Sequence, residues 1–150
     1  MNDYTLTVAD LSITKQAESC RLVAYQDPVG IWTCGWGCTG PDIVAGTQWS
    51  QDEADARLLA AVASAETQVR AALKFQVTRE EFIALVDFTY NVGCGNFDHS
   101  TLLAKINAGD MAGAAQEFLK WDLAGGRVLQ GLLVRRQAEM KEFMTGWGDS

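Results

Sequence analysis

Two carboxylates and one hydroxyl stand close together in the N-terminal part of the sequence. Glu18 is followed by Asp27 after eight intervening residues, and Asp27 is followed by Thr33 after five more. Such a trio suits glycoside hydrolysis, because one carboxylic acid can protonate the leaving oxygen while the second carboxylate stabilises the cationic sugar or activates water. The hydroxyl can hold that water in line. This chemistry requires that the acid stay protonated near neutral pH.

The same three residues also have a purely structural interpretation. Glu18 can be a solvated helix residue, Asp27 a turn former and Thr33 a strand residue, and any acidic chain offers many such triples. The spacing alone therefore leaves both interpretations open, and the elements that position the three side chains have to be considered.

A β-hairpin is expected directly after a first helix that ends near Glu18. Short β-like runs at residues 22–26 and 31–36 flank the turn formed by residues 27–30. Proline at the second turn position and glycine at the fourth favour a type I turn with Gly30 left-handed, which is a three-residue hairpin loop with a bulge. This register pairs Tyr25 with Thr33, so it places Asp27 and Thr33 on one face.

Helical signals dominate after residue 46. Capping boxes at residues 50–53 and 78–81 predict a long amphipathic helix from Ser50 to about residue 74 and a second helix that stops near Gly93. Further helices are expected over residues 100–108, 110–120 and 132–143, each ending near a glycine.

The composition is that of a soluble globular protein of one domain. The chain has 150 residues, of which 48% are hydrophobic and 21% charged, so it can bury a core and is not disordered. Its formal charge of −7 argues against nucleic-acid binding, which needs a positive surface. The longest apolar run, residues 58–63, is too short for a membrane span, and no export signal is evident. We expect no membrane insertion, no cofactor and no metal.

Residues 18–40, with the sequence ESCRLVAYQDPVGIWTCGWGCTG, resemble the active-site segment of the phage-type lysozymes, glycoside hydrolase family 24. That family has an E-x8-D-x5-T triad followed by a G-x-G-H-T run. Later blocks resemble the family in the same order, so the resemblance covers nearly the whole chain after about residue 12. These blocks are residues 49–51, 84–93, 100–103, 107–110, 118–121, 124–126 and 131–136.

The resemblance implies a muramidase that cleaves the β-1,4 bond between N-acetylmuramic acid and N-acetylglucosamine in peptidoglycan. By position, Glu18 would be the general acid, Asp27 the second carboxylate, and Thr33 would help to place the attacking water. Similar family members are inverting, which predicts carboxyl groups about 6.5–9.5 Å apart.

The resemblance also implies residues that support this trio. Tyr90, Asn91 and Ser100 match positions that line the glycan cleft, and Thr39 is a further candidate. Arg135 falls where the family has a cation beside the acid, although Arg136 could fill the same role.

The fold that the resemblance implies is α+β and mainly helical, a lysozyme-like fold of two lobes in a single catalytic domain. A small N-terminal lobe with a β-hairpin or sheet is expected over about residues 12–49, a connecting helix over about 50–74 and a helical lobe over about 75–148. Two lobes joined by one helix can open and close around a polymer.

Cys38 replaces the histidine of the family's G-x-G-H-T run. Histidine is not part of the triad, so catalysis should survive this change. Cys20 lies two residues from the acid. Cysteines there could act as a redox brake, as in related membrane-tethered endolysins, or be small buried apolar residues, which we favour. A bridge between Cys34 and Cys38 would need the chain to turn, because these positions lie about 13 Å apart along an extended strand.

Other chemistry-bearing residues have simpler interpretations. A zinc site of Cys34, Cys38, Cys94 and His99 would lack the short C-x2-C spacing of strong zinc motifs. The only histidine, His99, is expected in a surface loop near the cleft. The five tryptophans are expected to pack, with sugar stacking as the alternative for Trp36, Trp49 and Trp147.

We therefore expect a monomeric phage endolysin that acts on bacterial peptidoglycan. It would wait in the host cytoplasm until a separate holin opened the inner membrane and released it to the periplasm and the wall. The alternatives are a lytic transglycosylase, a catalytically inactive peptidoglycan-binding protein and a metal-bound structural module.

Overall fold

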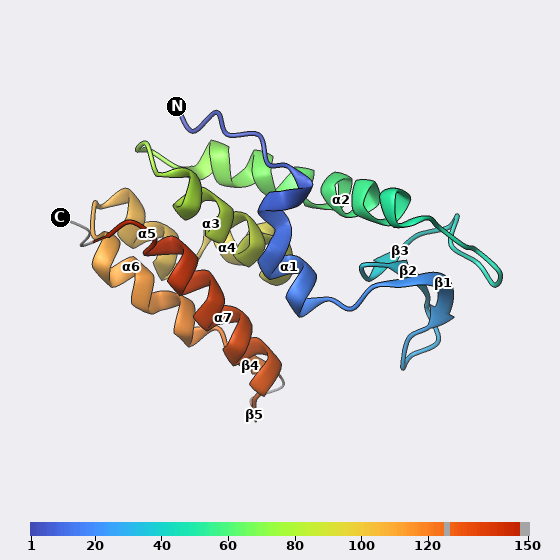
Figure 1. Cartoon of the computed structure of the whole chain (residues 1–150). Coiled ribbons are helices and arrows are strands. Elements are labelled where there is room, and N and C mark those ends of the chain that lie inside the picture. Colours follow the sequence, from blue (N-terminus) through green and yellow to red (C-terminus); the bar gives the residue numbers. More distant parts are fainter. Residues whose placement is uncertain (125–126, 148–150) are drawn as a thin grey trace. The chain divides into compact units, whose positions relative to one another are not determined.

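The computed structural model describes residues 1–124 and 127–147. The fold is α+β and mainly helical, as expected (Figure 1). In chain order the elements are η1 (Val8–Leu11), α1 (Ser12–Ala17), β1 (Arg21–Gln26), β2 (Trp32–Gly35), β3 (Cys38–Thr39), α2 (Gln51–Ala72), α3 (Arg79–Val92), α4 (Cys94–Asp98), α5 (Thr101–Asn107), α6 (Met111–Glu117), η2 (Phe118–Lys120), β4 (Leu123–Ala124), β5 (Arg127–Val128) and α7 (Gln130–Phe143).

The chain forms two compact units and passes from one to the other twice, after Thr5 and inside α2. One unit, here called the sheet unit, is Leu6–Ala63. The other, the helical unit, is Met1–Thr5 together with Ser64–Ser150. No helix among the described residues is both long enough and apolar enough to span a bilayer.

The sheet unit contains an antiparallel sheet of three strands in the order β1-β2-β3. The turn between β1 and β2 is closed by the Gly30 N–H, which donates to the Asp27 carbonyl at 2.9 Å, and Gly30 has a φ of +88°. Tyr25 lies opposite Thr33. The predicted turn, the left-handed glycine and the register are therefore confirmed.

A second turn, between β2 and β3, depends on two glycines with positive φ, Gly35 at +65° and Gly37 at +87°. A Cβ on Gly35 would lie 2.9 Å from the Trp49 ring and 3.3 Å from the Cβ of Ala54. Gly35 thus lets the sheet approach the start of α2 closely. Around it, Cys34, Ile43, Trp49 and Ala54 form the buried core of this unit.

The helical unit is built around α3, whose residues from Glu81 to Thr89 are all buried. A helix that is buried on every side has to lie inside its unit, and α3 packs against α7. Phe88 contacts three aromatic rings edge-on, with ring-centre distances of 6.4, 5.5 and 5.4 Å to Phe97, Phe118 and Trp121. Such edge-to-face pairs add stability beyond the area that they bury.

The predicted helices match the observed ones to within two or three residues, and the capping signals explain why. At the start of α3 the Glu81 N–H donates to Thr78 Oγ1 at 3.1 Å, and the Thr78 N–H donates to Glu81 Oε1 at 2.7 Å. At the start of α2 the Glu53 N–H donates to Ser50 Oγ at 3.1 Å. Helix α4 and the short paired strands β4 and β5 were not predicted, because elements of five and two residues are too short to show a period.

The tryptophans pack within their units. Trp49 belongs to the buried core of the sheet unit, and the Trp36 indole N–H donates to Asp55 at 2.8 Å. In the helical unit, Trp121 packs edge-on against Phe88, and the Trp147 ring centre lies 5.4 Å from that of Phe143.

Candidate active site

Glu18 lies where helix α1 ends and the chain turns toward β1. Its backbone is extended, and its N–H donates to the Thr14 carbonyl at 2.9 Å, so it is the C-cap of the helix. The side chain is half-buried. The residue is thus at the helix end where the sequence predicted it, between the helix and the sheet.

The Glu18 carboxyl reaches the turn between β2 and β3. A Cβ placed on Gly37 would lie 3.0 Å from Glu18 Oε2, which is closer than ordinary contacts allow. Gly37 also has a φ of +87°, which only glycine adopts without strain. Glycine is therefore needed at the second glycine position of the G-x-G pattern for two physical reasons: the conformation of the turn and the space that this carboxyl occupies.

Asp27 holds its own hairpin turn together through one carboxylate oxygen. Its Oδ1 accepts hydrogen bonds from the N–H groups of Val29, at 3.0 Å, and Ile31, at 2.9 Å. Among the described residues, no hydrogen bond reaches the other oxygen, Oδ2. Asp27 is therefore both a turn former and a fixed carboxylate with one oxygen available.

Thr33 is buried, with 5% of its surface exposed, and its hydroxyl donates to the Ile31 carbonyl at 3.0 Å. A carbonyl can only accept, so the hydroxyl hydrogen is committed and the Thr33 oxygen is left as an acceptor. Because Thr33 lies opposite Tyr25, and Tyr25 is two residues from Asp27, Thr33 and Asp27 share one face of the hairpin. Thr39 lies opposite Thr33 on β3, on the same face.

The other candidate ligand-binding residues lie in the helical unit. Tyr90 and Asn91 are in the last turn of α3. Ser100 is the N-cap of α5; its hydroxyl accepts from the Leu103 N–H at 3.0 Å and donates to the Phe97 carbonyl at 2.7 Å. The hydroxyl hydrogen of Ser100 is therefore used in a hydrogen bond within the protein.

Arg135 and Arg136 belong to a buried group of charged side chains between α3 and α7 that the sequence did not predict. Arg135 donates to both oxygens of Asp87, from Nε at 3.0 Å and from Nη2 at 2.7 Å. Arg136 is fully buried and pairs with Glu139, Nε to Oε1 at 3.0 Å. It also donates from Nη2 to Asn91 Oδ1 at 2.5 Å. The only signal in the sequence was Asp87 inside an apolar helical run.

Burial perturbs the protonation of this group. Burial raises the pKa of Glu139 well above its ordinary value, and the nearby Asp87 carboxylate adds to this effect. Burial also lowers the pKa of Arg136, although the nearby Glu139 opposes the shift. A protonated Glu139 can donate to Asp87, and the charge of Asp87 then balances that of Arg135.

The four cysteines are free thiols. Because the chain turns at residues 35–37, Cys34 and Cys38 lie directly opposite each other on β2 and β3, so the extended-strand spacing does not apply. Cys34 is fully buried, and Cys20 and Cys38 pack against the same core. Burial raises the pKa of both the Cys34 and the Cys38 thiols. Cys34 is thus a small buried core residue, and Cys20 and Cys38 are half-buried at the edge of the same core.

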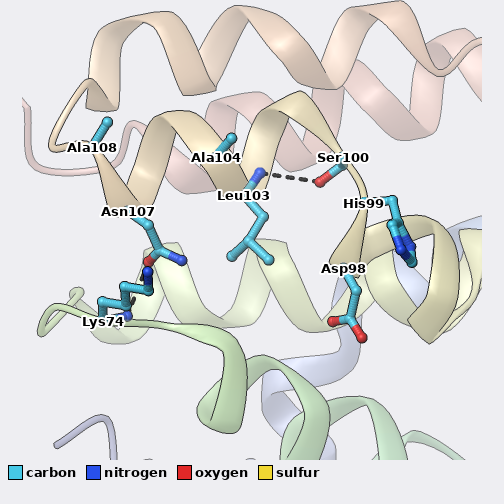
Figure 2. Close-up of a pocket in the computed structure, with 8 residues that line it drawn as sticks. All are labelled: Lys74, Asp98, His99, Ser100, Leu103, Ala104, Asn107 and Ala108. Atoms are coloured by element: carbon cyan, nitrogen blue, oxygen red, sulfur yellow. Dashed lines mark hydrogen bonds between the residues drawn. The ribbon is translucent and has the colours of Figure 1, made fainter.

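The described residues contain no group of three or more His, Cys, Asp or Glu side chains arranged to hold a metal ion. His99 is exposed at the end of α4, and its Nδ1 lies 2.9 Å from the Gly95 carbonyl. It lines a depression of about 430 Å³ in which Figure 2 shows Lys74 and Asp98 at opposite ends, with Leu103 between them. The sequence prediction that His99 lies at the surface is confirmed.

The comparisons with known proteins agree with one another. The Phage lysozyme family model matches residues 15–139. A SAR-endolysin from Enterobacteria phage PA-2 is 38% identical over 131 residues, which are 87% of this chain and 78% of that protein.

Two solved structures are also similar. An endolysin from Escherichia coli O157:H7 phage FAHEc1 has a TM-score of 0.87 and 31% identity, and the match covers 95% of each chain. The muramidase domain of SpmX from Asticaccaulis excentricus has a TM-score of 0.82 and 31% identity, covering 91% of this chain and 95% of that one. With a family match over most of its length and relatives above 30% identity, this chain belongs to the phage lysozyme family of endolysins.

Proposed function

We propose that this chain is a muramidase that hydrolyses the β-1,4 bond between N-acetylmuramic acid and N-acetylglucosamine in peptidoglycan. One observation carries the proposal: the β1–β2 hairpin presents the Asp27 carboxylate and the Thr33 oxygen on one face, while Glu18 rests against the next turn of the same sheet. Family membership and the similarity to the muramidase domain of SpmX support it.

In this proposal Glu18 is the general acid. Its protonated carboxyl gives a proton to the glycosidic oxygen as the bond between that oxygen and the anomeric carbon breaks. Because position 37 is a glycine, no Cβ occupies the space beside Oε2 of Glu18 there.

Asp27 and Thr33 place the attacking water. The Thr33 oxygen accepts one hydrogen of the water, because its own hydrogen is committed to the Ile31 carbonyl. Asp27 Oδ2 accepts the other hydrogen and takes that proton as the water oxygen bonds to the anomeric carbon. The reaction inverts the anomeric configuration, which predicts about 6.5–9.5 Å between the carboxyl groups of Glu18 and Asp27.

The roles that rest on the resemblance alone are part of the same proposal. Tyr90, Asn91, Ser100 and Thr39 contribute to glycan binding, and Arg135 supports the acid. The buried position of Arg135, 5% exposed and held by Asp87, suits a side chain whose task is support rather than substrate contact.

The test is a digest of purified peptidoglycan by wild type and by Glu18→Gln, with clearing of the wall suspension measured and the products identified. The proposal expects a wild-type product with a reducing N-acetylmuramic acid of inverted configuration, and a variant about a thousandfold slower. Asp52→Asn, an exposed change in the same unit, is the control. Equal clearing by Glu18→Gln would overturn the assignment of the acid.

The nature of the product separates the remaining alternatives. Anhydro ends in place of reducing ends would identify a lytic transglycosylase. Wall binding by wild type without any clearing would identify a non-hydrolytic binding protein.

We also propose that the chain acts as a monomer and reaches the wall from the host cytoplasm through a holin lesion. Expression in a bacterial host with and without a co-expressed holin tests this route. Lysis that depends on the holin is expected, and lysis without it would show that the chain crosses the inner membrane in another way.

A further inference from the structure

One carboxylate of the sheet unit, that of Asp55 on α2, receives three donors on a single oxygen. Its Oδ1 accepts from the Trp36 indole Nε1–H at 2.8 Å and from Gln51 Nε2 at 3.0 Å. Lys15 Nζ lies 3.5 Å from the same oxygen and 5.4 Å from the centre of the Trp36 ring. The Asp55 and Lys15 side chains are 20% and 24% exposed, so salt screens this pair less than it screens a surface ion pair. This one oxygen therefore connects α1, the turn between β2 and β3, and α2.

Two of the donors belong to the segments that surround the Glu18 carboxyl. Lys15 is in the last turn of α1, the helix that Glu18 caps. Trp36 is the middle residue of the turn between β2 and β3, and the next residue, Gly37, lies against Glu18 Oε2. Asp55 therefore connects the helix end that carries Glu18 to the turn that its carboxyl approaches.

The third donor extends this connection to the chain that follows Glu18. Gln51 Nε2 donates to Asp55 and also lies 3.8 Å from Cys20 Sγ, within the range of a weak hydrogen bond to sulfur. Cys20 is two residues after Glu18. Positions on both sides of the acid are thus connected with Asp55, one directly and one through Gln51.

The turn between β2 and β3 needs an anchor of this kind. Gly35 and Gly37 both have positive φ, and glycine restricts the backbone less than any other residue. The backbone of the turn therefore does little to fix the position of Gly37 against the Glu18 carboxyl. The residue between the two glycines is Trp36, whose indole N–H is held by Asp55.

Asp55 is a fixed anion rather than a second acid. The hydrogen bond from Trp36 lowers the pKa of Asp55 against the opposing effect of burial, and Gln51 and Lys15 lower it further. At neutral pH this carboxylate therefore has no proton to give to a substrate, but it can hold its three donors.

We propose that Asp55 is a positioning residue for the general acid, because it holds both the helix end that carries Glu18 and the turn that the Glu18 carboxyl approaches. The inference rests on the proposed function, in which Glu18 protonates the glycosidic oxygen. A general acid has to stand within hydrogen-bond reach of its target, and a displacement of about 1 Å can lower the rate about a hundredfold. Loss of Asp55 should therefore lower kcat and leave KM nearly unchanged.

The test measures kcat and KM for the release of reducing ends from purified peptidoglycan. Asp55→Ala removes the acceptor of all three donors, and we expect kcat to fall about tenfold while KM changes less than about twofold. Asp55→Asn keeps an oxygen for the Trp36 indole and loses the charge that pairs with Lys15, so it should recover most of the lost rate. Asp52→Ala, which removes an exposed carboxylate three residues earlier on α2, is the matched control and should act as wild type.

A double-mutant cycle shows whether Asp55 acts through Trp36. Trp36→Phe keeps an aromatic ring for Lys15 and removes the indole N–H that donates to Asp55. If the two residues act as one unit, the double variant with Asp55→Ala should be about as slow as Asp55→Ala alone. Rate losses that multiply would overturn the route through Trp36.

The contact itself is measured without reference to activity, by NMR of the Trp36 indole N–H, whose resonance Trp36→Phe assigns. The resonance should move upfield in Asp55→Ala and stay in place in Asp52→Ala. An unmoved resonance in Asp55→Ala, or a wild-type kcat, overturns the proposal. Should Asp55→Ala not fold, Trp36→Phe decides: a several-fold lower kcat supports the proposal and a wild-type kcat contradicts it.

Failure of this inference can be told apart from failure of the proposed function. If Glu18→Gln is inactive and Asp55→Ala has the wild-type kcat, the hydrolase and its acid stand and only the positioning role is lost. If Glu18→Gln clears walls as fast as wild type, the acid is wrongly assigned, and the role of Asp55 toward it is lost as well.

Discussion

The sheet unit and the helical unit hold their polar residues in different ways. In the sheet unit, Asp27 and Thr33 bond to main-chain groups of their own hairpin. In the helical unit, Arg135 and Arg136 bond to side chains, among them Asp87 on another helix. The first arrangement depends on turn geometry, and the second on burial and charge balance. Each should therefore fail under a different kind of substitution.

The largest effect is expected when the buried charge group loses a partner. Asp87→Ala leaves the Arg135 guanidinium, which is 5% exposed, without the carboxylate that binds it twice. The free energy of unfolding, measured with urea, should fall by about 3–5 kcal/mol. Asp98→Ala, which removes an exposed carboxylate of the same unit, should cost under about 1 kcal/mol. Equal losses would mean that burial is not what distinguishes the group.

In the sheet unit the corresponding change should affect activity and spare stability. Asn in place of Asp27 keeps an Oδ1 that accepts from the N–H groups of Val29 and Ile31. Its neutral amide, however, cannot take up a proton as the carboxylate can. Asp27→Asn should lower kcat about a hundredfold or more, measured by wall clearing, with little change in the urea midpoint. A large drop in stability would show that the turn needs the charge itself.

The same difference explains which features of the fold and of the candidate site could be predicted from the sequence. Pro28 and Gly30 specify the hairpin turn through local backbone preferences, so the register that places Asp27 and Thr33 on one face could be predicted and was confirmed. The helix starts at Ser50 and Thr78 follow from capping, which is also local.

The buried group of the helical unit could not be predicted in this way. Asp87 and Arg135 are 48 residues apart, and the residues around each of them in the sequence do not indicate that the two side chains pair. Helix α4 is only five residues long and shows no period. Contacts between distant segments depend on how whole helices pack, which short-range patterns do not encode.

The titration of Glu139 gives a test that applies to the buried charged group of the helical unit. Burial and the nearby Asp87 carboxylate raise the pKa of Glu139 well above 4.5 in the folded chain. The folded chain then holds a proton that the unfolded chain releases, so the free energy of unfolding falls as pH rises from about 4.5 through the folded-state pKa. The slope reaches at most about 1.4 kcal/mol per pH unit.

Glu139→Gln should remove this slope, because glutamine keeps an N–H donor for Asp87 and has no proton to lose. Urea unfolding at a series of pH values measures it. A variant with the wild-type slope would place the proton on another group.

The smallest expected effect separates two glycines that share one conformation. Gly30 and Gly37 have φ values of +88° and +87°, so alanine at either position should cost about 1 kcal/mol of stability. A Cβ at Gly30 meets nothing within 4 Å, whereas one at Gly37 meets the Glu18 carboxyl. Only Gly37→Ala should also lower kcat, several-fold. Equal kcat values for the two variants would show that Glu18 tolerates displacement.

Asp27 Oδ1 accepts two main-chain hydrogen bonds, and this limits how much the length of the hairpin loop can vary. Surface loops usually accept insertions and deletions. Here an added or lost residue would move the N–H groups of Val29 and Ile31 away from Oδ1, and the carboxylate would lose its fixed direction along with the turn. The hydrogen bonds of Asp27 therefore fix the length of this loop, and engineering of the tip is confined to the side chains of Pro28 and Val29, both of which are exposed.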